Sequence, residues 1–269
     1  INRQKDEGKR SQDLGHAMSA EYVAMGEIYR LYEAHCQRSG LVDFAELLLR
    51  VYTLWKERPD ILAQYQNTFH HILVDEFQDT NTIQYLWLQT LCGPDCAMTV
   101  VGDDDQSIYG WRGAKIENIH RFNRDFGPCE TIRLEQNYRS SEVILSAANS
   151  LIKNNESRLG KELWTDINGG DKITLYGGFN ELDEARFIAE RIRASYREGV
   201  AYQDMAVLYR SNAQSRVIEQ ALRSYQIPYK IYGGLRFFDR AEIKDALAYL
   251  RLLVNANDDP AFERVINMP

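Results

Sequence analysis

The sequence has no long apolar run, few cysteines, and only 6 prolines and 17 glycines among its 269 residues. No stretch approaches the ~18 consecutive apolar residues of a membrane-spanning helix, so we expect no membrane segment. The low proline and glycine counts exclude a collagen-like or low-complexity chain. With 44% hydrophobic and 26% charged residues, the composition indicates a folded globular protein of one large domain or two small ones.

We also expect no signal peptide. The chain begins with Ile1 and a polar stretch, and no basic segment precedes an apolar one. It stops at Pro269, just after an expected helix. We interpret the sequence as an internal piece of a larger protein.

Cysteine is too scarce for a disulfide scaffold. The four cysteines are Cys36, Cys92, Cys96 and Cys129. A zinc or iron–sulfur site at Cys92 and Cys96, with His70 and His71 upstream, is one interpretation, but the spacing fits no standard zinc pattern. Reduced thiols in a cytosolic protein are the interpretation that we favour.

The net charge is −7, from 32 basic and 39 acidic residues. This balance argues against a protein that coats nucleic acid by bulk charge. It does not exclude a local positively charged surface. Residues 110–124 contain one acidic residue, Glu117, and four basic residues: Arg112, Lys115, Arg121 and Arg124. A solvated helix face is the simpler explanation of this run.

Residues 1–69 have the pattern of a helical region. Apolar side chains recur at helical spacing between Glu21 and His35, and again after Asp43. Gly40 predicts the end of the first helix and Pro59 the end of the second. A further short helix is expected from Asp60 to Gln66.

From residue 70 the pattern changes to short apolar runs. Ile72–Val74 and Met98–Val101 are typical of strands buried on both faces, with a helix over Thr82–Leu91 between them and a third strand at Thr131–Leu134. This order predicts a parallel α/β sheet. Acidic residues follow the first two strands, at the carboxyl ends where open α/β sheets bind ligands.

A second α/β unit is expected downstream. Its predicted helices are Ser140–Asn155, Asn180–Tyr196, with Asn180 as N-cap, and Ala213–Tyr225; its predicted strands are Lys172–Tyr176, Ala206–Tyr209 and Tyr229–Tyr232. The chain becomes helical again from Ala241 to about Asn255.

The first chemical motif is the apolar strand that ends in Asp75-Glu76, the arrangement called Walker B. Mg²⁺ keeps several waters and takes few protein ligands, a role that we assign to Asp75. Glu76 points the other way on the strand and can polarise an attacking water. A strand followed by an acidic turn explains this motif alone just as well.

The second motif follows the second strand. Gln106 can sense a γ-phosphate without binding the metal, and Tyr109, Trp111 and Arg112 come within six residues of it. Aromatic side chains next to a basic one are typical of surfaces that stack on single-stranded bases. The alternative for Trp111 is a place in the core.

The third motif is Asn137-Tyr138-Arg139-Ser140. An arginine on a loop between two α/β units can reach a phosphate bound by the first unit, as an arginine finger does. Tyr138 can stack on the adenine. The alternative for Arg139 is a structural bond to a helix end.

With these three motifs in this order, the chain resembles the UvrD/Rep-like superfamily 1 helicases over essentially its whole length. Further matching segments are Gly40–Leu47, Leu208–Arg216 and Tyr232–Phe238, followed by Glu242-Ile243-Lys244-Asp245. Together these segments make a chance match negligible.

The resemblance implies an ATP-dependent helicase that moves 3′-to-5′ on single-stranded DNA and unwinds duplexes in DNA repair or replication, with ATP and Mg²⁺. It implies parts of two RecA-like (P-loop NTPase) parallel-sheet domains with inserted helical subdomains. In that plan the two RecA-like domains are called 1A and 2A, and their helical insertions 1B and 2B. Residues 1–69 would be the end of 1B and residues 70–135 the later part of 1A. Residues 136–232 would be the first part of 2A, and residues 233–269 the beginning of 2B.

It also implies roles for single residues. Asp75 holds the metal, Glu76 is the catalytic base, Gln106 the γ-phosphate sensor, Tyr138 the adenine-stacking residue and Arg139 the arginine finger. DNA contacts are implied for Tyr109, Trp111, Arg112, Arg210 and Asn212. The expected protein is bacterial, cytoplasmic and nucleoid-associated, binds single-stranded DNA and its junctions with duplex, and has DNA-repair proteins as partners; its oligomeric state stays open.

One departure from the family is plain. No G-x-x-x-x-G-K-[ST] motif occurs, since Gly8-Lys9 is followed by Arg10 and Gly160-Lys161 by Glu162. We therefore expect the 269-residue piece alone to be inactive and poorly soluble. A non-catalytic DNA- or partner-binding module and a part of a helicase–nuclease are the alternatives.

Overall fold

The structure is a computed structural model that describes residues 1–14, 20–156, 158–232 and 241–266. The chain divides into two compact units, Ile1–Ile173 and Thr174–Pro269. Most of the expected Tyr232–Phe238 motif lies outside the described residues. In the described part, no helix is long and apolar enough to cross a membrane.

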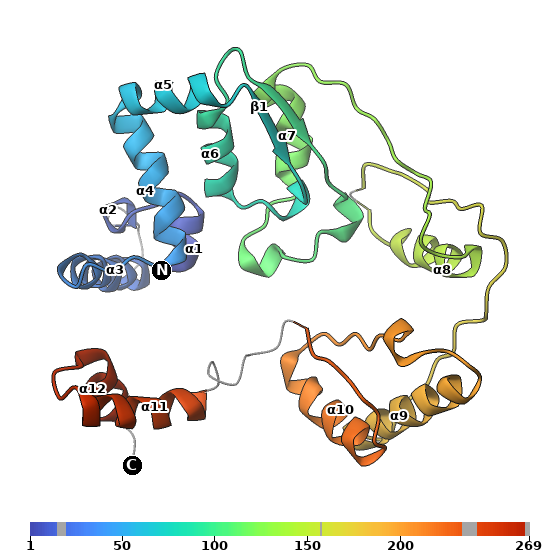
Figure 1. Ribbon diagram of the computed structural model, residues 1–269. Helices are drawn as coiled ribbons and strands as arrows, with labels where there is room; N and C mark the ends of the chain where they lie inside the picture. The colour runs from blue at the N-terminus through green and yellow to red at the C-terminus, as the bar shows by residue number, and fades with distance from the viewer. Residues whose placement is uncertain (15–19, 157, 233–240, 267–269) are drawn as a thin grey trace. The chain divides into compact units, whose positions relative to one another are not determined.

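The first unit opens with helices (blue to cyan in Figure 1). They are α1 (Asn2–Asp6), α2 (Ser11–Leu14), α3 (Ala20–Arg38), α4 (Phe44–Glu57) and α5 (Pro59–Thr68). The Asp43 side chain accepts a hydrogen bond from Glu46 N and so caps α4. Pro59 occupies the first turn of α5, where its missing N–H costs nothing. The three helices expected here are confirmed.

A buried ionic cluster joins α1 to α4. The Lys5 side chain is almost fully buried and lies 2.8 Å from Asp43 Oδ2 and 2.9 Å from Glu46 Oε2. Arg10 adds a contact of 2.7 Å to Glu46 Oε1. A buried charge is tolerated only when it is paired in this way. The pairs therefore fix α1 against α4.

Two parallel strands form the sheet of the first unit. They are β1 (His71–Val74) and β2 (Ala97–Val100), with Val74 opposite Val100, and α6 (Thr82–Leu91) connects them. Asn81 and Gln84 form a capping box at the start of α6. Both strands and the parallel pairing, the α/β core of the expected fold class, are confirmed.

The prediction that both faces of these strands are buried is wrong for the described chain. Ile72 and Val74 pack against a core of Phe77, Tyr85, Leu88 and Phe122. Leu73, which points to the opposite face, is 79% exposed. The reason is that α6 and α7 (Glu117–Phe126), which supply Tyr85, Leu88 and Phe122 to this core, cover the face that carries Ile72 and Val74.

Short elements follow the strands. They are the 3-10 turns η1 (Phe77–Asp79), η2 (Asp104–Gln106) and η3 (Gly110–Arg112), and then the helix α8 (Glu142–Ile152). Beyond α8 the chain returns to form a single parallel bridge between Gln136 and Trp164. The helix expected over Ser140–Asn155 is thus confirmed with shorter bounds.

Helices make up the regular structure described in the second unit (yellow to red in Figure 1). They are α9 (Glu181–Arg197), η4 (Tyr202–Asp204), α10 (Asn212–Ser224), α11 (Ala241–Val254) and α12 (Asp259–Val265). The Asn180 side chain accepts from Asp183 N at 2.9 Å, as an N-cap does. Helices α9 and α10 pack around Ala189, Leu222 and Ile227.

Four expected strands are not strands in the structure. They are Thr131–Leu134, Lys172–Tyr176, Ala206–Tyr209 and Tyr229–Tyr232. A strand forms only where a neighbouring segment pairs with its N–H and C=O groups, and the described residues give these segments no ladder partner. As a result Leu134, Leu175 and Leu208 are 79%, 97% and 94% exposed.

Candidate functional site

The carboxyl ends of β1 and β2 meet, as the sequence predicted. Backbone pairing continues past the strands, since Val101 N donates to Val74 O at 2.7 Å and Phe77 N donates to Val101 O at 3.0 Å. The loop that carries Asp75 and Glu76 is therefore joined to the loop that begins at Gly102. This is the edge at which parallel sheets bind their ligands.

Glu76 has an unusual backbone. Its φ of 52° and ψ of 42° place it in the left-handed region, which costs energy for any residue with a Cβ and is common at functional sites. Asp75 Oδ1 accepts a hydrogen bond from Glu76 N at 2.9 Å. Both side chains are exposed. Two accessible carboxylates are hard oxygen ligands of the kind that Mg²⁺ takes, so the donor set fits this ion.

Gln78 is a site residue that the sequence did not reveal. It is 1% exposed. Its Nε2 donates to Glu76 Oε2 at 2.6 Å, and its Oε1 accepts from Asp103 N at 2.9 Å. The only signal in the sequence is a polar residue directly after Phe77 in a short segment, which does not distinguish a buried amide from an exposed one.

Gln106 lies exposed in η2, close to the same edge. Its Nε2 donates to Asp103 Oδ2 at 2.7 Å. Burial raises the pKa of Asp103, but hydrogen bonds from Lys161 and Gln106 outweigh that effect and hold the pKa below its usual value. The Gln106 amide is thus bound to a carboxylate of its own loop.

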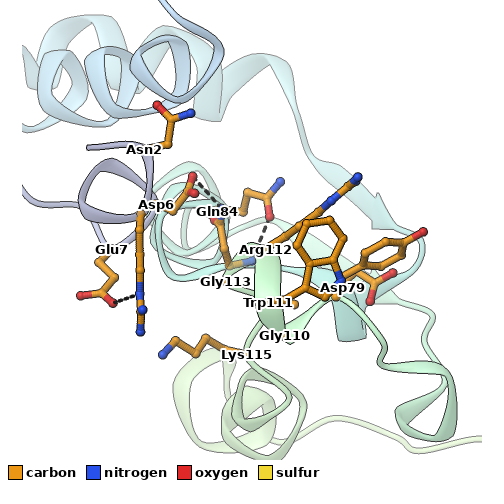
Figure 2. A pocket seen from close by; sticks show the side chains of 14 residues that line it. Asn2, Asp6, Glu7, Asp79, Gln84, Gly110, Trp111, Arg112, Gly113 and Lys115 are labelled. Carbon is orange, nitrogen blue, oxygen red and sulfur yellow. Dashed lines mark hydrogen bonds and ion pairs between the residues drawn. The ribbon is translucent and has the colours of Figure 1, made fainter. Parts of the chain in front are cut away.

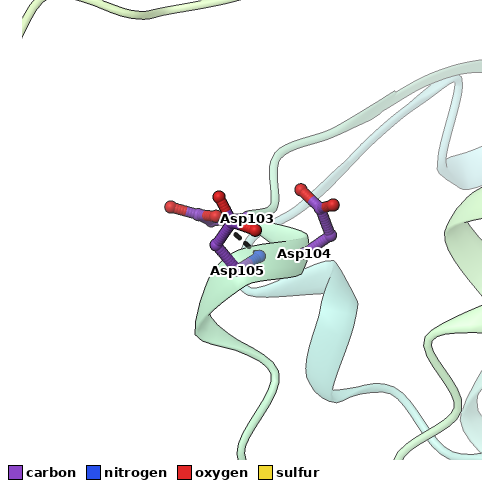
Figure 3. Close-up of side chains that lie close together, drawn as sticks. All are labelled: Asp103, Asp104 and Asp105. Atoms are coloured by element: carbon purple, nitrogen blue, oxygen red, sulfur yellow. Dashed lines mark hydrogen bonds between the residues drawn. The ribbon is translucent and has the colours of Figure 1, made fainter. Parts of the chain in front are cut away.

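Three consecutive carboxylates follow β2: Asp103, Asp104 and Asp105 (Figure 3). Their oxygens lie within 4.8 Å of one another, close enough for a metal. Each already has a protein partner: Lys161 pairs with the first, Leu159 N donates to the second at 2.7 Å, and Arg158 binds the third through two bonds of 2.7 and 2.6 Å. The cluster therefore holds the segment 158–161 against the β2 loop.

The aromatic side chains of the second motif form a small exposed group. The Arg112 guanidinium lies 4.6 Å from the centroid of the Trp111 ring and 5.1 Å from that of Tyr109, within the range of cation–π attraction. Trp111 is 64% exposed. A place in the core of the described chain is therefore excluded for Trp111, and its side chain is accessible to a ligand.

A cavity of about 840 Å³ lies beside this group (Figure 2). The loop supplies Tyr109 to Lys115, and α1 with its flank supplies Asn2, Arg3, Asp6 and Glu7. The contribution of α1 was not visible in the sequence, because it depends on packing. One of the bonds that hold α1 here runs from Asn81 Nδ2 to Asp6 Oδ1 at 3.1 Å.

Asp79 lines both this cavity and a smaller one of about 340 Å³ that Asp75 and Glu76 also line. Its Oδ1 is buried without a hydrogen-bond partner among the described residues. Burial, and then the charge of Glu76, raise the pKa of Asp79. Asp79 thus stands between the acidic pair and the Trp111 cavity.

Tyr138 and Arg139 are both exposed. Asn137 Oδ1 accepts from Arg139 N at 3.0 Å and from Ser140 N at 2.8 Å, which fixes the turn. No hydrogen bond or ion pair joins Arg139 to Glu76 or Gln106 within the described ranges. The structure therefore does not bring the third motif into contact with the first two.

Arg210 and Asn212 belong to the second unit and lie at the start of α10. Gln214 Oε1 accepts from Arg210 N at 3.1 Å and from Ser211 N at 3.0 Å. Both predicted contact residues are exposed. An exposed arginine beside a helix N-terminus can bind a phosphate.

Cys92 and Cys96 are free thiols. The Cys92 Sγ lies 3.8 Å from the Cys96 carbonyl oxygen. Burial raises the pKa of Cys92 to about 11. Among the residues whose positions are described, no histidine joins these cysteines in a metal-binding group.

Two family models cover almost the whole chain. The UvrD/REP helicase N-terminal domain matches residues 1–127, and the UvrD-like helicase C-terminal domain matches residues 132–269.

Named relatives agree with these matches. DNA helicase II of Escherichia coli is 59% identical over 269 residues, and that of Haemophilus influenzae 60%; each match covers 100% of this chain and 37% of the relative. The ATP-dependent DNA helicase PcrA of Staphylococcus aureus is 48% identical over 242 residues, which is 90% of this chain and 33% of the relative. The chain thus spans about a third of the length of these relatives.

Proposed function

The chain belongs to the UvrD-like helicase family, whose fold is the RecA-like α/β type, and on that premise we propose that it is part of an ATP-dependent 3′-to-5′ DNA helicase. The observation that supports this most is the meeting of two loops at one sheet edge. One loop carries Asp75 and Glu76, and the other runs from Gln106 to the exposed Trp111. In this proposal an ATP-hydrolysing site and a DNA-stacking surface share the second loop.

Glu76 is the proposed base of ATP hydrolysis. Its carboxylate takes a proton from water, the water oxygen attacks the γ-phosphorus, and the bond from that phosphorus to the β-phosphate oxygen breaks, releasing ADP and inorganic phosphate. Asp75, with Glu76 nearby, would hold Mg²⁺, which neutralises phosphate charge when bound.

The remaining ATP contacts need movement. Gln106 would exchange its bond to Asp103 for a bond to the γ-phosphate. Tyr138 would stack on the adenine and Arg139 would reach the phosphates as an arginine finger. Because the third motif touches neither of the others within the described residues, its approach would be the step that ATP binding drives.

Single-stranded DNA is the proposed track. Tyr109, Trp111 and Arg112 would stack on its bases, beside the cavity described above. Arg210 and Asn212 would hold its backbone from the start of α10. Junctions of single- and double-stranded DNA, and DNA-repair proteins, are the proposed partners, in the bacterial cytoplasm.

The proposed domain map follows the family plan. Residues 70–135 and 136–232 would belong to two RecA-like domains, and residues 1–69 and 233–269 to helical insertions. The meeting of β1 and β2 within the first of these segments supports its RecA-like character.

The test uses the whole protein, meaning a chain that carries these 269 residues together with a phosphate-binding loop. Duplexes with a 3′ or a 5′ single-stranded tail are mixed with ATP and Mg²⁺, and unwinding and phosphate release are followed. We expect DNA-stimulated phosphate release and unwinding of the 3′-tailed duplex only. DNA binding without phosphate release would instead support the non-catalytic module.

A further inference from the structure

The buried amide of Gln78 connects the two loops of the site. On one side it donates to Glu76 Oε2 at 2.6 Å, and on the other it accepts from the backbone of Asp103 at 2.9 Å. The residue is only 1% exposed, so its polar atoms depend on these partners in place of water.

Chemistry fixes which way the amide points. An ionised carboxylate only accepts hydrogen bonds and a backbone N–H only donates, so Nε2 must face Glu76 and Oε1 must face Asp103. At neutral pH, only an amide among side chains of this length offers a donor and an acceptor at once. An ionised carboxylate here would repel Glu76, and a thioether would donate no hydrogen bond to it.

The β2 loop approaches Gln78 closely. A Cβ at Gly102 would lie 2.9 Å from Gln78 Oε1 and 3.3 Å from Phe77 Cβ, so a side chain there would push the loop away. Glu76 meanwhile holds a strained left-handed backbone. The position of the loop and the direction of the Glu76 carboxylate are therefore tied through one side chain.

We propose that Gln78 is a positioning residue that couples the Glu76 carboxylate to the loop 102–112, so that DNA bound at Trp111 sets the orientation of the catalytic base. The coupling rests on the proposed function of the site. It predicts that DNA stimulates hydrolysis through Gln78, whereas a purely structural glutamine would change stability and leave that stimulation intact.

Gln78→Met removes both bonds with little change of volume, and Gln66→Met is the matched control. Gln66 is partly buried, less so than Gln78, and its Nε2 lies 2.9 Å from Thr90 O; among the described residues no hydrogen bond joins it to either loop. In the whole protein, the melting temperature, kcat and KM for ATP, and Kd for oligo-dT are measured for both variants.

For Gln78→Met we expect the DNA-stimulated kcat to fall about 10- to 100-fold. KM and Kd should stay within about twofold, and the ratio of the DNA-stimulated rate to the basal rate should fall. Gln66→Met should leave the stimulation unchanged at a comparable loss of melting temperature. A Gln78→Met protein that keeps its DNA stimulation would overturn the proposal.

Gln78→Glu gives a second readout that does not depend on how well Gln78→Met folds. A carboxylate at this position offers Asp103 N an acceptor but offers Glu76 no donor. We therefore expect Gln78→Glu to keep the bond to the β2 loop and to lose the DNA stimulation of kcat; a Gln78→Glu protein that keeps the stimulation of the parent would contradict the coupling.

Glu76→Gln separates the two proposals. If Glu76→Gln is inactive and Gln78→Met is normal, only the coupling fails. If Glu76→Gln keeps its turnover, the proposed role of Glu76 fails with it.

Discussion

Two regions of the chain consist of short apolar runs and yet differ in structure. One is the sheet edge at β1 and β2, and the other comprises the segments 172–176, 206–209 and 229–232. At the edge, two short apolar runs pair in parallel and their loops are tied through Gln78. The three later segments have no ladder partner among the described residues, and Leu175 and Leu208 are almost fully exposed.

The difference shows that the regular structure at the site depends on pairing between segments that are distant in the chain. An apolar run becomes a strand, and its loop becomes a site, only when another segment supplies backbone hydrogen bonds. Helices α9 and α10 lie between those unpaired segments and still form, because their hydrogen bonds and caps are local.

The largest expected effect concerns the unpaired segments. Since exposed apolar runs with open backbone groups associate with one another, the 269-residue chain expressed alone should aggregate, and without a phosphate-binding loop it should hydrolyse no ATP. Light scattering and DNA-stimulated phosphate release on the purified chain check this. A monodisperse chain with DNA-stimulated turnover would contradict the expectation that the unpaired segments make the chain aggregate and that it hydrolyses no ATP.

Glu76→Gln tests the paired edge directly. The amide cannot accept the proton of the attacking water, so kcat of the whole protein should fall by about 10²- to 10⁴-fold. Binding of ATP and of single-stranded DNA should persist, as measured by fluorescence titration. Near-normal turnover would show that Glu76, at this sheet edge, is not the base of ATP hydrolysis.

Trp111→Ala tests the far end of the same loop. Loss of a stacking surface should weaken single-strand binding by about 1–3 kcal/mol, which is roughly a 5- to 150-fold rise in Kd. The melting temperature should hardly change, because Trp111 is exposed. Phe69→Ala, at another exposed aromatic of the first unit, is the control and should leave DNA affinity unchanged.

Asn180→Ala tests whether the helices of the second unit are locally determined. Loss of the bond from Asp183 N to the Asn180 side chain should destabilise the first turn of α9 by about 1 kcal/mol. Amide hydrogen exchange of α9 measures this. Ser141→Ala is the matched control, since Ser141 precedes α8 without a side-chain capping bond, and equal effects of the two changes would contradict the local account.

The smallest effect is expected at Asp79. Because burial and Glu76 raise its pKa, its contribution to stability is present below the unfolded-state pKa and is lost as the pH rises through the folded-state pKa. Asp79→Asn should therefore raise the melting temperature at pH 7, by about 2 °C or less, and the gain should disappear below about pH 4. A gain that is independent of pH would show that the charge is not its cause.

Sequence alone determined the helices α3 to α6 and α8 to α11, the first two strands and the order of the motifs. Capping residues such as Asp43 and Asn180 and the apolar periodicity act within a few residues, so they can be recognised along the chain. The acidic pair at the end of β1 could be found for the same reason: a strand end and its next residues are neighbours in sequence.

Only the tertiary structure decided which distant groups meet. It placed Gln78 between Glu76 and Asp103, brought α1 to the Trp111 cavity, and left three apolar segments without a partner among the described residues. Strand pairing and buried polar contacts join residues far apart in the chain, and their free energy depends on the partner as much as on the residue itself.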